Sequence, residues 1–286
     1  MSDAESSTYK QGWHPSVTAN HATRTANIEA SFILEHLKPD FHILDLGCGP
    51  GTITTSLATY VPQGSVTGID ITPEVIAQAK ELARQKGGLP SNVTFCTGDV
   101  LKGLPFEDER FDVVFCSQVL LHVPEPVKAM KEMRRVCKGG GFVADREGDM
   151  PFRWFPYLKG LQLSNKYMYQ LVLDGKPAST PHPDNPPFPE GHRGGSLIHV
   201  WAREAGFDPS NITKGARATT YGTPEERARY AENVKNRIEH GGHRQKYLAL
   251  GATSEEVDTI IQDVQRWAAH PDGVHYILQC ETICWK

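Results

Sequence analysis

The glycine-rich segment 43–52, Ile-Leu-Asp-Leu-Gly-Cys-Gly-Pro-Gly-Thr, contains the residue types of a ligand-binding turn. It leaves an apolar run and enters a segment whose apolar residues are spaced by four, so it predicts a strand, a tight loop and a helix. Gly47, Gly49 and Gly51 permit positive φ angles and let a ligand approach the backbone at a helix N-terminus. Cys48 lies within this loop, where packing explains its thiol better than nucleophilic reactivity does.

The charge around this loop distinguishes between two kinds of cofactor. The glycines follow the pattern G-x-G-x-G, whereas a dinucleotide fingerprint requires G-x-G-x-x-G and position 52 is Thr. Asp45 precedes the first glycine by two residues, and its carboxylate would repel a pyrophosphate and attract an ammonium group. The pattern therefore favours a ligand with an ammonium group. A nicotinamide-dependent oxidoreductase built on the same kind of sheet is the alternative that this pattern disfavours.

Two more carboxylates end apolar runs farther along the chain. Asp70 ends the second run, roughly 20 residues after the last loop glycine, where an acid can accept hydrogen bonds from both ribose hydroxyls. Asp99 ends the third run, where it can accept a hydrogen bond from an adenine amino group. Ile71 and Val100 are placed to sandwich the adenine ring. Open α/β sheets bind ligands at the carboxyl ends of their strands, so these acids predict a nucleoside site.

Alternating apolar and amphipathic segments predict a parallel sheet covered by helices on both faces. The predicted strands are 41–47, 65–71, 92–100, 110–118, 140–148, 212–221 and 274–285. The predicted helices include 27–37, a segment from 53 to 61, one capped by Thr72, an apolar stripe over 197–205, and two that begin with capping boxes at Thr223 and Thr253.

The composition changes after residue 149, where aromatic residues become frequent and are followed by a Pro-, Gly- and His-rich loop over 177–195. The aromatic stretch and the helices after it could form an apolar lid over a substrate. We predict an N-terminal arm, a cofactor-binding core, a substrate-side segment with a late strand, a helical cap insertion and a final core strand. These segments cover residues 1–26, 27–149, 150–222, 223–273 and 274–286 in that order.

In order and spacing, these residues resemble the class I S-adenosylmethionine-dependent methyltransferases, and within them the ubiquinone/menaquinone-type small-molecule branch. The resemblance rests on LDLGCGPGT, on the GID and TGD acids, on FDVVFCSQVLLHVPEPVKAMKEMRRVCKGGG and on the AGF before a late strand. It covers residues 20–148 closely and the rest in outline. CKGGG replaces the family's usual Lys-Pro-Gly-Gly, which should alter only a turn. The resemblance implies a Rossmann-like, doubly wound α/β sheet of seven strands with a late antiparallel strand, and S-adenosyl-L-methionine as the cofactor.

The resemblance also implies roles for individual residues. Asp45 and the loop glycines would hold the methionine end of the cofactor, while Ser117, Gln118 and His122 would line the methionine and reaction side. The full predicted cofactor site is Asp45, Gly47, Cys48, Gly49, Gly51, Asp70, Ile71, Asp99, Val100, Ser117, Gln118 and His122. His122 is the one candidate catalytic residue, and a packed core histidine is its alternative.

Other polar residues near the expected site could have either a structural role or a role in ligand binding. Arg146, Glu147 and Asp149 end the fifth predicted strand, either as a structural ion-pair cluster or as substrate contacts. The remaining candidates lie in the N-terminal arm, where they could close over the cofactor, and in the Pro-rich loop, where they could bind a substrate anion: His14, His21, Arg24, His192 and Arg193.

Composition narrows the class of partner. The chain has 286 residues and a formal net charge of −4, which disfavours non-specific nucleic-acid binding. No apolar run approaches the ~20 residues of a membrane span, and the first residues lack a signal-peptide pattern. The six cysteines are scattered and several lie in apolar segments, which indicates reduced thiols and a cytoplasmic location. We expect a methyltransferase acting on a small-molecule acceptor, without a metal. The alternative is a catalytically silent, cofactor-binding regulator; oligomeric state and acceptor atom stay open.

Overall fold

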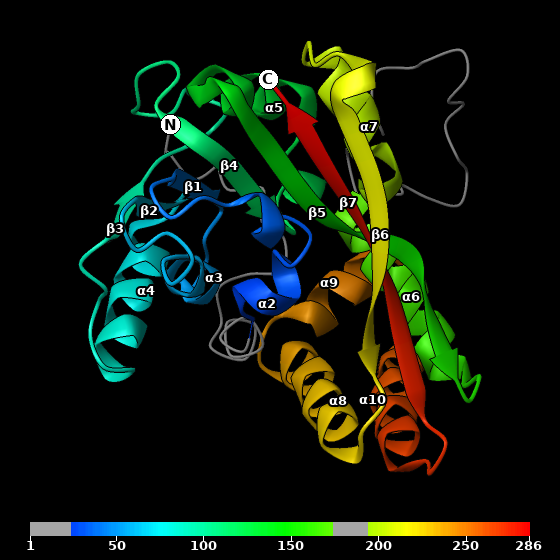
Figure 1. Cartoon of the computed structure of the whole chain (residues 1–286). Helices are drawn as coiled ribbons and strands as arrows, with labels where there is room; N and C mark the ends of the chain where they lie inside the picture. Colours follow the sequence, from blue (N-terminus) through cyan, green and yellow to red (C-terminus); the bar gives the residue numbers. More distant parts are fainter. Residues whose placement is uncertain (1–23, 174–193) are drawn as a thin grey trace, which may run out of the picture.

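The computed structural model describes residues 24–173 and 194–286 (Figure 1). Most of the predicted N-terminal arm and most of the Pro-rich loop lie outside these residues. The candidates His14, His21, His192 and Arg193 lie outside them as well.

Seven strands form one mixed sheet in the order β3-β2-β1-β4-β5-β7-β6. Their bounds are β1 His42–Leu46, β2 Ser65–Asp70, β3 Val93–Thr97, β4 Phe111–Ser117, β5 Cys137–Phe155, β6 Ile212–Tyr221 and β7 Val274–Trp285. Strands β1 to β5 pair in parallel, and β7 lies antiparallel between β5 and β6. All seven predicted strands and the late antiparallel pairing are thus confirmed. The strand order reverses between β1 and β4, which creates the switch point where such sheets bind ligands.

Helices cover both faces of this sheet. Their bounds are α2 Ala26–Glu29, η1 Leu34–His36, α3 Thr52–Leu57, α4 Pro73–Gln85, η2 Leu120–His122, α5 Pro126–Val136, α6 Lys159–Leu173, α7 Gly194–Glu204, η3 Pro209–Asn211, α8 Pro224–Glu239, α9 His243–Ala249 and α10 Ser254–Ala269. Buried side chains of α5 and α7 pack on one face, and those of α2, α3 and α4 pack on the other. This double covering is the Rossmann-like α/β fold that the sequence predicts.

The single helix predicted over 27–37 is wrong. The segment forms the short helix α2, leaves helical geometry at Ala30 (φ −118°, ψ 13°) and continues into the 3₁₀ turn η1. Ala26, Ala30 and Ile33 are all buried against the sheet. The break lets this short segment pack closely on the sheet, and that tertiary contact overrides the helical spacing of the sequence.

Strand β5 is longer than the predicted 140–148, because its second half pairs with β7 beyond the end of β4. The long strands β5, β6 and β7 thereby leave the core and meet α8, α9 and α10, drawn in yellow to orange in Figure 1. These three helices and α6 enclose two apolar clusters of their own. We call this helical group the cap. Both predicted capping boxes are confirmed, at Thr223 with Glu226 and at Thr253 with Glu256.

Candidate active site

A cavity of about 690 Å³ runs from the glycine loop to the cap. Its volume is in the range that holds a small-molecule ligand. The predicted cofactor residues that line it are Gly47, Cys48, Gly49, Asp70, Ile71, Asp99, Val100, Ser117, Gln118 and His122. They come from the carboxyl ends of the parallel strands, as the sequence predicts. The two predicted residues that do not line the cavity are Asp45 and Gly51.

The three loop glycines have different local requirements. A Cβ at Gly47 would lie 2.5 Å from Val119 Cγ2, and a Cβ at Gly51 would lie 2.4 Å from Phe95 Cζ. These two glycines therefore allow close packing. Gly49 also has a positive φ of 51°, but a Cβ there would meet no atom within 4 Å. Gly49 is the position at which the backbone itself faces the open cavity.

Two acids are held at the end of the cavity beside the glycine loop. Asp70 is buried at the end of β2; its Oδ2 accepts a hydrogen bond from the Gly49 N–H at 2.9 Å and its Oδ1 one from the Ile71 N–H at 2.8 Å. Burial raises the pKa of Asp70. Asp99 accepts a hydrogen bond from the Leu101 N–H at 2.9 Å. Each carboxylate oxygen has more than one acceptor site, so both acids can still accept bonds from a ligand.

The position of Asp45 corrects the prediction that three acids share the cavity. Its side chain is buried below the loop and accepts a hydrogen bond from Thr54 Oγ1 at 2.6 Å. Alternate residues of β1 point to opposite faces of the sheet, and Asp45 shares a face with the buried Ile43 rather than opening at the strand end. Its role is therefore structural, supporting the first turns of α3.

Burial raises the pKa of Asp45 to about 7 from its usual 3.8. The folded chain therefore binds more protons than the unfolded chain between these values, and the contribution of Asp45 to stability falls as the pH rises through that window. We expect Asp45→Asn to raise the free energy of unfolding at pH 8 by about 1–3 kcal/mol, and to leave it unchanged at pH 4. Urea unfolding at both pH values checks this. A loss of stability at pH 8 would contradict it.

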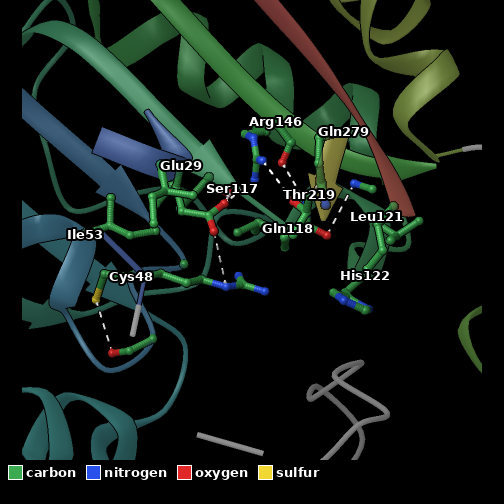
Figure 2. Close-up of a pocket in the computed structure, with 18 of the residues that line it drawn as sticks. Glu29, Cys48, Ile53, Ser117, Gln118, Leu121, His122, Arg146, Thr219 and Gln279 are labelled. Atoms are coloured by element: carbon green, nitrogen blue, oxygen red, sulfur yellow. Dashed lines mark hydrogen bonds and ion pairs between the residues drawn. The ribbon is translucent and has the colours of Figure 1, made fainter. Parts of the chain in front are cut away.

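The turn after β4 is held by neighbouring strands (Figure 2). Gln118 has a left-handed backbone, with φ of 60°, which is unusual outside glycine. Its amide Nε2 donates to Gln279 Oε1 at 2.7 Å, and its backbone N–H donates to the Arg146 carbonyl at 2.9 Å. Glu147 Oε1 accepts the N–H groups of Val119 and Leu120, each at 2.7 Å. These bonds fix the strained turn and present Gln118 and the following η2 to the cavity.

Arg146 lies at the centre of a buried ion-pair network. This is one of the two interpretations that the sequence leaves open for it. It pairs with Glu29 of α2, and its Nε lies 3.4 Å from Glu281 Oε1 on β7. Arg217 Nε lies 3.2 Å from Glu281 Oε2, and Arg24 Nε lies 3.7 Å from Glu29 Oε1. The ion-pair interpretation of Arg146 is thus confirmed; Arg146 also lines the cavity, and a contact with the substrate stays a prediction.

The other two acids of the fifth strand serve packing. Glu147 is buried beneath the turn after β4, as described above, and Asp149 accepts a hydrogen bond from Ser196 Oγ of α7 at 2.6 Å. Neither lines the cavity. Cys48 does line it, but burial raises the pKa of its thiol well above the usual value, which argues against a nucleophilic role. Residues 24–173 and 194–286 contain no cluster of three or more His, Cys, Asp or Glu side chains that could hold a metal ion.

Sequence reasoning missed most of the cavity wall that faces the cap. The consecutive residues 217–221 of β6 line this wall together with residues of α8. Period-two alternation of the predicted strand 212–221 would place Arg217, Thr219 and Tyr221 on a common face, but it does not predict that the residues between them also line the cavity.

The comparisons agree with this arrangement. A family model described as "Methyltransferase domain" matches residues 37–175. The probable methyltransferase ltbC of Aspergillus luteorubrus is 32% identical over 298 residues, covering 100% of this chain and 99% of that protein. The chain belongs to the methyltransferase family. The predicted enzyme class, an S-adenosylmethionine-dependent methyltransferase, is thus confirmed at the level of the family.

Two further similarities are a sequence match to part of this methyltransferase and a structural match to its fold. A demethylmenaquinone methyltransferase of Staphylococcus aureus is 40% identical over 109 residues, which are 38% of this chain and 43% of that protein. The solved structure of the YcgJ protein of Bacillus subtilis has a TM-score of 0.53 and 17% identity, covering 93% of this chain and 99% of that one. This second likeness supports the fold alone. No helix among the described residues of the methyltransferase is long and apolar enough to span a membrane.

Proposed function

We propose that this methyltransferase binds S-adenosyl-L-methionine along the carboxyl ends of β1 to β4 and transfers its methyl group to a small-molecule acceptor held against the cap. The observation that carries the proposal is the continuous cavity. It joins Gly49, Asp70 and Asp99 at one end to Gln118 and His122 in the middle and to Tyr221 at the cap. A mild net negative charge and a concave cavity of about 690 Å³ support a small acceptor rather than a nucleic acid. Six free cysteines support a cytoplasmic location.

The residues at the sheet edge fit this cofactor. The open space beside Gly49 admits a ligand against the backbone. S-adenosylmethionine contains no phosphate group, so its binding brings no second anion close to the Asp70 carboxylate. Asp70 would accept hydrogen bonds from the ribose hydroxyls, and Asp99 one from the adenine amino group. Ile71 and Val100 line the cavity beside these acids and would pack on the adenine ring. Ser117 and Gln118 would line the methionine end.

The protein itself would align the acceptor with the methyl group and exclude water from the site. When bound, the cofactor supplies a methyl group on a sulfonium, which is activated for in-line displacement. The turn from Ser117 to His122, fixed by β5 and β7, would hold the reacting centre in place. Phe152 and Met168 line the cavity and keep the acceptor side apolar. An aromatic face near the sulfonium would stabilise its charge by roughly 0.5–2 kcal/mol.

The proposed ribose contact predicts the effect of Asp70→Ala. We expect the affinity for S-adenosylmethionine to fall by about 1–3 kcal/mol, because charge-assisted hydrogen bonds to the ribose are lost. Isothermal titration measures this directly. The matched control is Asp208→Ala, which removes an exposed acid that caps η3. Equal affinities for the two variants would remove Asp70 from the site.

His122 is the proposed general base for acceptors whose nucleophile carries a proton. It lies in η2 at the cavity wall. For such an acceptor, we expect His122→Ala to lower kcat by roughly 10²–10⁴-fold and to abolish the acidic limb of the pH–rate profile. The exposed His240 serves as the control position. An unchanged profile would exclude His122 as a base.

Transfer of a labelled methyl group tests the proposed function. The protein is incubated with methyl-labelled S-adenosylmethionine and a panel of phenols, quinols, thiols, amines and organic acids, and label in the products is measured. We expect at least one acceptor to gain label in step with formation of S-adenosylhomocysteine. Tight cofactor binding without label in any acceptor or cell extract would instead support the regulator.

A further inference from the structure

The acceptor end of the cavity has an apolar wall. The residues that form it come from β5, β6, β7, α6 and α8, and they are Met150, Phe152, Met168, Tyr221, Tyr230 and Ile277. Such a wall suits an acceptor whose body is aromatic or an extended hydrocarbon, because burying apolar surface supplies most of the binding free energy.

The charged groups at this end are not balanced. Three guanidinium groups, those of Arg24, Arg146 and Arg217, share the two carboxylates of Glu29 and Glu281. This network therefore carries one net positive charge before any residue of the cap is counted. A cavity end with this excess favours a negatively charged ligand.

The cap adds two cations to the same wall, Arg229 and Arg237 of α8. Arg237 lies on α8 and lines the cavity, and it forms no ion pair with any acid in the described part of the chain. Its Nε is buried without a hydrogen-bond partner. A buried N–H of a guanidinium that stays unpaired costs free energy, so a ligand acceptor at this position would stabilise the site. Glu226 also lines the wall, but its Oε2 already accepts the N–H groups of Gly222 and Thr223.

The titratable groups around Arg237 do not compensate its charge. Burial raises the pKa values of Tyr221, Tyr230 and Tyr247, so these phenols stay protonated at neutral pH. Burial also lowers the pKa of His243 to about 4, which keeps its ring neutral. Within the described residues, the aromatic and histidine side chains around Arg237 are therefore neutral and leave its charge uncompensated, so a ligand anion would supply the counter-charge.

We propose that the methyl acceptor is an organic acid whose carboxylate binds Arg237 while its apolar body packs against the cap wall. This inference rests on the proposed methyl transfer to a small molecule. A guanidinium presents parallel N–H donors that match the two oxygens of a carboxylate. The acceptor would be oriented by its two ends, with the carboxylate toward α8 and the nucleophile toward Gln118 and His122.

The test measures binding to protein saturated with S-adenosylhomocysteine, so that it does not depend on turnover. The ligands are matched pairs of an aryl carboxylate and its carboxamide: benzoate with benzamide, cinnamate with cinnamamide, and the hydroxybenzoates with their amides. Phenyl phosphate is a third arm. We expect at least one carboxylate to bind roughly tenfold or more tightly than its amide. Arg237→Gln should reduce this preference to near unity, and Arg237→Lys should retain part of it.

Arg266→Gln is the matched control, because it removes an exposed arginine of α10 that does not line the cavity. Unchanged affinity for S-adenosylhomocysteine shows that each variant is folded. The inference is overturned if no carboxylate binds, if acid and amide bind equally, or if Arg237→Gln keeps the preference. A preference for phenyl phosphate over every carboxylate would overturn the organic-acid assignment. Failure to bind S-adenosylhomocysteine would instead contradict the proposed function.

Discussion

Gly49→Val is expected to reduce the affinity for S-adenosylmethionine by on the order of 100-fold. The valine Cβ would occupy the open space that the cofactor needs, and its branched side chain would be strained at a φ of 51°. The structure singles out this glycine, because the other two glycines of the loop pack against Val119 and Phe95. Equilibrium binding of S-adenosylmethionine measures the effect.

Gly140→Val is the matched control for backbone strain. Gly140 also has a positive φ, 78°, and open space around its Cβ position, but it lies near the exposed start of β5 and does not line the cavity. We expect this variant to lose stability without losing affinity for the cofactor. If both valine variants bind S-adenosylmethionine as tightly as the parent protein, the cofactor does not approach the loop backbone.

Arg146→Met is expected to destabilise the fold by about 3–5 kcal/mol. The Arg146 side chain is 3% exposed, and its removal leaves Glu29 and Glu281 buried with reduced compensation. The network joins α2 to β5, β6 and β7, so its loss should also loosen the wall of the cavity. Denaturant unfolding followed by circular dichroism gives the change in the free energy of unfolding.

Two variants make this measurement decisive. Arg84→Met removes an arginine from an exposed pair with Glu81 and should leave the midpoint of unfolding unchanged. Adding Glu281→Gln to Arg146→Met should restore part of the lost stability, because the buried Glu281 would otherwise keep only the half-exposed Arg217 as a partner. If Arg146→Met destabilises no more than Arg84→Met, the network is not a structural element of the fold.

The sequence predicted those features that depend on local patterns. The seven strands follow from apolar runs bounded by turn residues, and both capping boxes follow from Thr and Glu three residues apart. Asp70 and Asp99 were placed in the cavity because strand ends converge at one edge of a parallel sheet. These predictions required no knowledge of which distant segments pair.

The wrong or missing predictions concern features that depend on the direction of a side chain or on contacts between residues far apart in the sequence. The spacing of Asp45 before the glycines was correct for the motif, but spacing alone does not say which face of β1 its side chain occupies. The partners Glu29, Arg146 and Glu281 are far apart in the sequence and meet only because β7 inserts beside β5. Arg237 has no local signal at all, because the position of α8 over the cavity depends on the packing of the whole cap.

A crystal structure of the protein with S-adenosylhomocysteine tests the central claim most directly. The account predicts that the ribose hydroxyls donate hydrogen bonds to Asp70, that the adenine lies beside Asp99 and Val100, and that the sulfur faces Gln118 and His122 with open space toward Tyr221. A ligand bound with its ribose away from Asp70, or with its sulfur separated from the cap side of the cavity, would contradict the account.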